Sequence, residues 1–239
     1  AAAREFVISD TLAEYLAKTI QFTKTACGFF DVSIGAAVRA WGFYNGNYDI
    51  TSTTNLKKLV GIDKVVFDAT NKTVRFKTNG VELDAFYAGR GFVVDRVVKV
   101  LKSEGVTCAL VDLGHTDFYA IGAPPNKQHW AISLADLFEK RELGFVRLKD
   151  AALSISTSHE RNFDRNNVPR YRVIDPRTCD VITSVTMACA TAPTSLEAAM
   201  KAVALFVGGK DAAEKLMISG CYIAEDPNFR LSKFNAFEI

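Results

Sequence analysis

The clearest pattern in the chain is an amphipathic helix close to its first residues. Apolar and small side chains recur there at three- and four-residue spacing, as on one face of a helix (Leu12, Tyr15, Leu16, Ala17, Ile20 and Thr23). Asp10 precedes this stretch and is a suitable N-cap, because its carboxylate can accept hydrogen bonds from the first free backbone amides. Gly28 follows it, and we expect the helix to end near this glycine.

Turns, short helices and one hairpin are expected next. Residues 29–43 are turn-rich and then helical, and a short helix is expected over 54–59. Residues 65–69 and 73–77 alternate polar and apolar side chains on either side of a short polar turn, which predicts a β-hairpin. Residues 88–102 predict a helix whose apolar side chains share one face (Val93, Val94, Val97, Val98 and Leu101).

The second half of the chain is rich in predicted strands. These strands cover 107–113, 117–122, 129–134, 144–149, 151–157, 171–175, 184–191 and 221–225. Residues 159–169 are expected to form a polar loop, and Pro176-Arg177-Thr178 a turn. We expect a helix to begin at Pro193 and end before Gly208-Gly209, with a short helix over 212–218 after it.

The order of these elements predicts the fold class. Strands are interrupted by helices without strict βαβ alternation, which indicates an α+β fold with mixed or antiparallel sheets and packed helices. No internal repeat or low-complexity linker divides the chain, so we expect a single domain over residues 1–239.

The amino-acid composition argues against a disordered, a nucleic-acid-binding and a membrane-spanning protein. The chain has 239 residues, of which 49% are hydrophobic and 23% charged, so it can bury a core and is not disordered. The formal net charge is +2 without a clustered basic excess, which argues against a nucleic-acid partner. No run of 18 apolar residues occurs, so we expect no membrane span.

Cysteine and histidine usage gives little sign of a metal or disulfide framework. The five cysteines are an odd number and include no CxxC pair, which argues against a disulfide scaffold and a zinc ribbon. We interpret them as core or strand thiols in a reducing compartment, the cytoplasm or an organelle interior. The three histidines lack metal-ligand spacing (His115, His129 and His159).

Ordered motifs carry a resemblance that goes further. Gly28-Phe-Phe-Asp31-Val-Ser33-Ile-Gly35, followed by Trp41-Gly42-Phe43, resembles the G-x-F-D-P-T/S-V-G…W-G-F signature of the ApbE family. The other motifs follow in the family's order: the hairpin VGIDKVVFD…TVRF…VELD (60–84), Gly91-Phe92 with Asp95-Arg96, Leu113-Gly114, Ser156 with Glu160-Arg161-x-Phe163, Ile174-Asp175-Pro176-Arg177-Thr178, and ALFVGG (204–209).

The resemblance implies a flavin nucleotide as ligand. The family transfers FMN from FAD to a threonine or serine of another protein, so FAD or FMN is the expected cofactor. The positions that match its flavin site are Asp31, Ser33, Gly35, Asp84, Arg90, Gly91, Gly114, Ser156, Asp175, Arg177 and Thr178.

Each of these residues also has a structural interpretation. Asp31 and Ser33 are suited to capping the helical stretch after them. Asp175 would bond its own turn and leave Arg177 free to meet a phosphate. Arg90 keeps the charge of the family's lysine, which suits a pyrophosphate and a surface ion pair equally.

The departures from the family pattern are concentrated at the expected site. The family holds Mg²⁺ with a D-x-x-x-T pair on its last helix, and the corresponding residues are Ala199 and Val203, which cannot ligate a hard cation. Glu197 lies roughly 200° around that helix from Ala199 and is a poor substitute. We therefore expect no magnesium and assign no metal ligand.

Other family residues of the site are also replaced. Tyr171-Arg172 stands where the family has a histidine, and a permanently protonated arginine cannot act as a general base. The remaining replacements are Cys179 and Thr157 for glycines, His115 in the G-G turn, and Phe86-Tyr87 for small residues at the flavin. Since these losses occur together, we assign no catalytic residue.

A protein partner is the last expectation. The strands that usually precede the helix at Asp10 in the family are absent here, which would leave an unpaired sheet edge. We expect another protein chain, or a further stretch of this protein, to cover that edge.

Three functional hypotheses follow. The departures favour a catalytically inactive relative that serves as a scaffold or subunit of a larger assembly. The alternatives are a flavin-binding protein without transfer, and an active Mg²⁺-dependent FAD:protein FMN transferase.

Overall fold

The computed structural model describes residues 4–44, 53–136, 141–158, 163–165, 168–170, 172–224, 230–235 and 237–238, with the backbone alone at 163–165, 168–170 and 230. It divides into two compact units. Unit 1 comprises Ala1–Ala85 and Arg161–Ile182, and unit 2 comprises Phe86–Glu160 and Thr183–Ile239. Each unit is taken by itself below, and the single domain over 1–239 stays a prediction.

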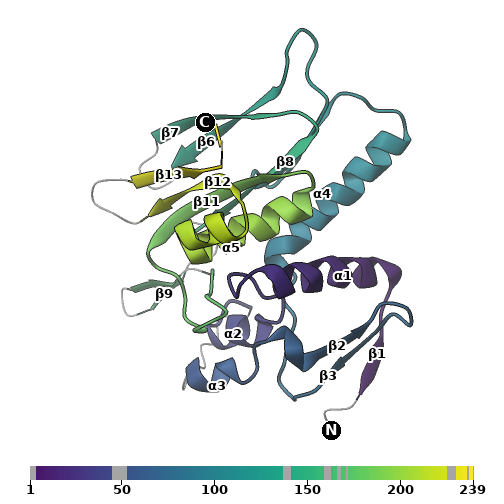
Figure 1. Cartoon of the computed structure of the whole chain (residues 1–239), viewed down its shortest axis with the longest axis vertical. Helices are drawn as coiled ribbons and strands as arrows, with labels where there is room; N and C mark the ends of the chain where they lie inside the picture. The colour runs from purple at the N-terminus through teal and green to yellow at the C-terminus, as the bar shows by residue number, and fades with distance from the viewer. Residues whose placement is uncertain are drawn as a thin grey trace. The chain divides into compact units, whose positions relative to one another are not determined.

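Unit 1 combines short helices with a three-stranded antiparallel sheet of order β1-β3-β2 (Figure 1). Its strands are β1 (Glu5–Val7), β2 (Val65–Asp68) and β3 (Thr73–Phe76), and β9 (Phe163–Arg165) and β10 (Val168–Arg170) form a separate hairpin. Its helices are α1 (Asp10–Thr25), α2 (Gly35–Ala40), α3 (Thr53–Lys57) and the 3₁₀ helix η1 (Ile62–Lys64).

Unit 2 is built on a six-stranded antiparallel sheet of order β13-β12-β11-β8-β5-β4 (Figure 1). Its strands are β4 (Ala109–Leu113), β5 (Asp117–Ile121), β8 (Ala151–Thr157), β11 (Val185–Ala192), β12 (Ser219–Ala224) and β13 (Arg230–Phe234). The other elements are the hairpin β6 (Trp130–Asp136) and β7 (Arg141–Leu148), and the helices α4 (Phe86–Ser103) and α5 (Ser195–Lys215).

The two faces of this sheet are covered by different elements. Tyr119 and Ala152 face a cluster that includes Val94 of α4 and Ala198 of α5, so the helices cover one face. On the other face, Phe118, Leu153 and Cys189 join a second cluster with residues of the β6–β7 hairpin, such as Leu134 and Leu148. Because strand side chains alternate between faces, both faces of the central strands are apolar.

The structure confirms the α+β class and most predicted elements. The hairpin at residues 65–77, the helix after residue 86 and the strands of unit 2 all form within a few residues of their expected bounds. Among the described helices, none combines the length and apolarity needed to cross a membrane.

Three helix predictions need correction. Ser9, rather than Asp10, caps α1, because its Oγ accepts from the Leu12 amide at 3.3 Å. Thr194, rather than Pro193, marks the start of α5, because its Oγ1 accepts from the Glu197 amide at 3.3 Å. The predicted break between two helical segments is confirmed, since the backbone of Gly209 is non-helical and kinks α5 there. The predicted apolar face of α4 is split: Val94 is buried, whereas Val93 and Val97 are 49% and 41% exposed.

Several strand predictions in both units need correction. The expected polar loop 159–169 contains the β9–β10 hairpin, while Tyr171 and the side chains of Glu160, Arg161 and Phe163 lie outside the described residues. In place of a strand over 171–175, the structure has only an isolated bridge from Ile174 to Val181. The edge strands β1 and β13 were not predicted.

Candidate functional site

The first group of site residues forms a hydrogen-bonded turn ahead of α2. Asp31 Oδ1 accepts from the Ser33 amide at 2.8 Å and from Ser33 Oγ at 2.6 Å. Ser33 Oγ is buried and accepts in turn from the Gly61 amide at 2.8 Å. Burial raises the pKa of the Asp31 carboxyl, which the hydrogen bonds from Ser33 oppose. The turn therefore holds a partly buried carboxyl group beside the start of η1.

Close packing against Glu82 leaves no room for a side chain at Gly35. A Cβ at this position would lie 2.8 Å from the Glu82 carbonyl oxygen, and the Gly35 amide donates to that oxygen at 3.1 Å. This contact packs the start of α2 against the backbone at Glu82, two residues before Asp84.

Asp84 lies in a buried ion pair. Arg172 Nη2 donates to its Oδ2 at 3.0 Å, and the two side chains are only 3% and 2% exposed for Arg172 and Asp84 respectively. Burial and the neighbouring Asp84 carboxylate raise the pKa values of Tyr15 and Tyr44. The residue at the family's histidine position is therefore a structural partner of Asp84, and Arg172 cannot take up a proton.

The Asp175-Pro-Arg-Thr turn is held by hydrogen bonds between its own residues, as expected. Asp175 Oδ1 accepts from the Arg177 amide at 2.8 Å, and Thr178 Oγ1 accepts from the Asp180 amide at 3.1 Å. The expectation that Arg177 is left free is wrong, because its Nε and Nη2 donate to Asp175 at 2.9 and 2.7 Å. A guanidinium and a carboxylate form such a two-point contact readily.

Arg177 nevertheless remains the accessible cation of this turn. Its side chain is 45% exposed, and its guanidinium lies 4.7 Å from the centre of the Phe29 ring. Its Cγ lies 3.0 Å from where a Cβ on Gly28 would sit, so the G-x-F motif packs against it. In unit 1, the structure thus brings together Gly28, Phe29, Asp175 and Arg177.

Cys179, which replaces a family glycine, closes the same turn. It adopts φ of 61°, its carbonyl accepts from Trp41 Nε1 at 2.8 Å, and burial raises the pKa of its thiol to about 11. Trp41 is buried in the core of unit 1.

Arg90 of unit 2 pairs with an acidic residue that sequence reasoning missed. Arg90 Nε lies 3.3 Å from Asp117 Oδ2, and Asp117 is buried and accepts from Ser154 Oγ and Thr116 Oγ1 at 2.8 and 3.0 Å. The sequence did contain a signal for Asp117, because this acidic residue is the first of a strand that is otherwise apolar. Gly114 adjoins this group: a Cβ there would lie 3.6 Å from Arg90 Nη1.

The remaining unit 2 positions have packing or surface roles. Gly91 lets α4 approach α5, since a Cβ there would lie 2.4 Å from the Ser195 carbonyl oxygen. Ser156 lies buried in β8, opposite Ala188 of β11. His115 is 92% exposed, and its Nδ1 lies 2.7 Å from Asp112 Oδ2.

The positions expected to hold Mg²⁺ do not fit a metal. Ala199 and Val203 on α5 are buried hydrocarbon side chains, with 1% and 6% exposure. Among the described residues, no three His, Cys, Asp or Glu side chains lie close enough together to hold a metal ion. A hard cation requires oxygen donors, so the family's metal has no visible protein ligands on this helix.

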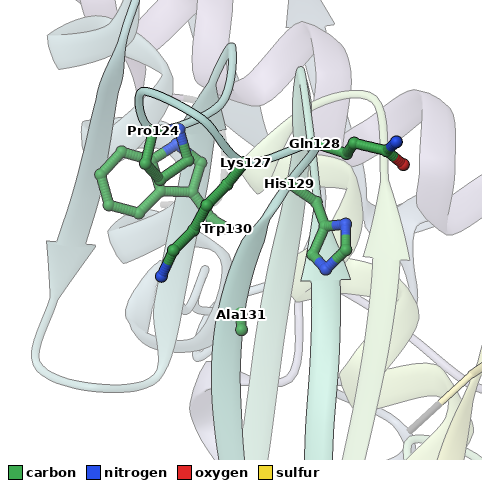
Figure 2. Close-up of a pocket in the computed structure, with 6 residues that line it drawn as sticks. All are labelled: Pro124, Lys127, Gln128, His129, Trp130 and Ala131. Carbon is green, nitrogen blue, oxygen red and sulfur yellow. The ribbon is translucent and has the colours of Figure 1, made fainter.

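A surface pocket of about 570 Å³ lies apart from all these residues in sequence. Figure 2 shows its lining from the loop before β6 and from β6 itself: Pro124, Lys127, Gln128, His129, Trp130 and Ala131. Trp130 and Pro124 supply its apolar wall, and none of the predicted flavin positions lines it.

Comparison with known proteins identifies what this chain resembles. A family model described as "ApbE family" matches residues 1–222. A FAD:protein FMN transferase of Rhodobacter capsulatus is 28% identical over 216 residues, which is 88% of this chain but 41% of that protein. Another from Treponema pallidum is 26% identical over 251 residues, covering 95% of this chain and 69% of the relative.

Solved structures support the fold. The ApbE protein of Thermotoga maritima superposes with a TM-score of 0.88 at 22% identity, covering 98% of this chain and 79% of that one. The apo flavinyl transferase ApbE of Pseudomonas stutzeri gives 0.85 at 21% identity, with 99% and 76% covered.

Proposed function

The chain belongs to the ApbE family, and we propose that it acts as an FAD:protein FMN transferase. The observation that carries the proposal is the family match over residues 1–222, a range that includes the motifs at Asp31, Asp84 and Asp175. The relatives named above carry that activity in their names. The substrate would be FAD, and the acceptor a serine or threonine of a protein.

The reaction exchanges a phosphoanhydride bond for a phosphate ester bond. The acceptor hydroxyl oxygen attacks the phosphorus of the FMN half of FAD, its proton passes to solvent, and AMP departs with the electrons of the broken P–O bond. Catalysis of such a transfer rests on positioning the groups and on neutralising the charge of the phosphates.

Arg177 is the residue of unit 1 that we assign to phosphate binding. Its guanidinium is fixed from one side by Asp175 and remains half-exposed, so it is oriented and still open to a ligand. A planar guanidinium suits phosphate oxygens because it offers two parallel donors. No step is assigned to magnesium, since the residues at the family's metal positions cannot hold it.

The proposal is tested by incubating the protein with FAD and a serine- or threonine-containing acceptor protein. Covalent flavin is detected by fluorescence after denaturing electrophoresis, and AMP by chromatography. We expect both products in equal amounts, and a 10- to 100-fold lower rate for Arg177→Gln, because a charge-assisted contact contributes about 1.5–3 kcal/mol.

Lys127→Gln is the matched control, since Lys127 is an exposed cation that lines the surface pocket instead of the flavin motifs. Thermal unfolding of both variants checks that each is folded. If the wild-type protein forms neither covalent flavin nor AMP with any acceptor, it is not a transferase.

A second candidate is the inactive scaffold or flavin-binding relative. Ala199 and Val203 favour it, because they remove the metal from a reaction that in this family uses one. FAD binding without AMP release would identify a flavin holder, and absence of binding would identify a scaffold.

A protein partner would suit either function. Strand β1 lies at an edge of its three-stranded sheet, with Val7 84% and Phe6 42% exposed. Exposed edge strands accept a further strand readily, so we propose a protein partner at β1. Mixing with the acceptor protein and measuring protection of residues 5–7 from hydrogen exchange tests this.

A further inference from the structure

Two cysteines of unit 2 lie face to face across neighbouring strands. Cys189 of β11 pairs directly with Cys221 of β12 in the antiparallel register, and their Sγ atoms are 3.2 Å apart. Both residues have no exposed surface. The other three cysteines have no such neighbour among the described residues: Cys27 and Cys108 are exposed, and Cys179 is buried in unit 1.

The surroundings of the pair are apolar. Both residues belong to the core cluster between the six-stranded sheet and the β6–β7 hairpin, together with side chains such as Met187, Leu153 and Ile223. Within this apolar cluster the two sulfurs make an S–H···S contact with each other.

We propose that Cys189 and Cys221 form a reversible modification site, a buried dithiol that hydrogen peroxide converts into a disulfide linking β11 to β12. A disulfide requires an S–S distance of about 2.05 Å, so the two sulfurs must approach by roughly 1 Å from their present positions. Residues directly opposite in an antiparallel pair have their Cβ atoms roughly 4.5–5.5 Å apart, so a small local adjustment brings them to bridging distance.

The oxidation balances with peroxide as the only co-reactant. One thiol loses its proton, its sulfur attacks a peroxide oxygen to form a sulfenic acid, and the O–O bond breaks to release hydroxide, which takes up the proton. The second thiol then attacks the sulfenic sulfur, an S–S bond forms, and a second water leaves. Two thiols and one peroxide therefore give one disulfide and two waters.

The two buried thiols should react slowly with peroxide. The disulfide, once formed, should link β11 covalently to β12. Burial, with the neighbouring Cys221, raises the pKa of the Cys189 thiol, so little reactive thiolate exists at neutral pH. The bond closes a loop that contains α5, which restricts the unfolded chain and stabilises the folded one.

The experiment treats the folded protein with hydrogen peroxide, alkylates the remaining thiols, and identifies linked peptides by mass spectrometry. We expect a peptide pair joining Cys189 to Cys221 that disappears after dithiothreitol, and a melting temperature raised by about 5–10 °C in the oxidised protein. Cys221→Ala and Cys221→Val should lose both effects, whereas Cys179→Ala, which removes a buried thiol from unit 1, should keep both.

Two results would overturn the proposal. One is peroxide treatment that oxidises Cys27 and Cys108 without ever linking Cys189 to Cys221 in the folded protein. The other is a linked pair that forms only together with loss of the folded state, seen as a lowered melting temperature.

Discussion

At the scale of single residues, Arg172 stands where the family has a histidine. Its side chain forms a structural ion pair with Asp84 and cannot act as a base. Both side chains are almost fully buried, so each neutralises a charge that has no access to water. Removing one partner leaves the other buried and unpaired, which costs more than the pair itself contributes.

Arg172→Met should therefore lower the free energy of unfolding by about 3–5 kcal/mol, measured by urea denaturation. The double variant Arg172→Met/Asp84→Asn should recover part of this loss, since no lone charge remains. A single-variant loss below 1 kcal/mol would contradict the structural role of the pair. Arg39→Met is the matched control, because Arg39 pairs with Glu82 at the surface with 55% exposure.

The raised pKa of Asp31 predicts how the stability of the folded protein depends on pH. Its pKa is raised by burial, so the folded protein binds this proton more tightly than the unfolded chain does. The contribution of Asp31 to stability is therefore fully present below its ordinary pKa of 3.8 and is lost as the pH rises through the raised value.

Asp31→Asn keeps an oxygen that accepts from Ser33 but cannot ionise. We expect this variant to gain stability relative to wild type at pH 7 and to lose that advantage near pH 4, in denaturation curves at both values. An advantage that grows as the pH falls would show that the direction of the shift is wrong. Asp68→Asn, at an exposed turn where hydrogen bonds lower the pKa, should show the opposite trend.

At the scale of elements, the contact of α4 with α5 depends on Gly91. The Ser195 carbonyl oxygen occupies the space that a Cβ would need, and Asp95 of α4 accepts from the Ser195 and Leu196 amides at 2.7 and 3.0 Å. Asp95 thus caps the start of α5 from a neighbouring helix, and its carboxylate is favourable at a helix N-terminus. The family's helix motif is therefore explained here by packing.

Gly91→Ala should lower the free energy of unfolding by about 1–3 kcal/mol, because the helices must separate to admit the methyl group. Val93→Ala, two residues along the same helix and half-exposed, should change it by less than about 0.5 kcal/mol. Equal effects in thermal unfolding would mean that α4 and α5 are not closely packed at Gly91.

At the scale of the whole molecule, the sequence predicted local structure well and pairing poorly. Periodicity located α4 and the strands of unit 2 because each buries an apolar face within its own window. It missed β1, whose partner β3 is remote in sequence, and it also missed β13, which pairs with the preceding strand β12. The same limit applies to the site, because Asp117, Ser154 and Arg90 meet only once the sheet and α4 have formed.

The departures from the family pattern were visible in the sequence, but their consequences were not. Arg172 was recognised as unable to act as a base, whereas its role as the buried partner of Asp84 required the fold. Ala199 and Val203 were expected to bind no metal, and the structure places both inside the core of unit 2. The inactivity inferred from them stays a prediction beside the better-supported transferase.

The most direct test of the account is the rate of FMN transfer from FAD to an acceptor protein, measured in EDTA and in millimolar Mg²⁺. Because Ala199 and Val203 offer no ligand, we expect covalent flavin and AMP at similar rates in both conditions. Transfer that requires Mg²⁺ would contradict the account of the metal positions, and its absence in both conditions would contradict the proposed function.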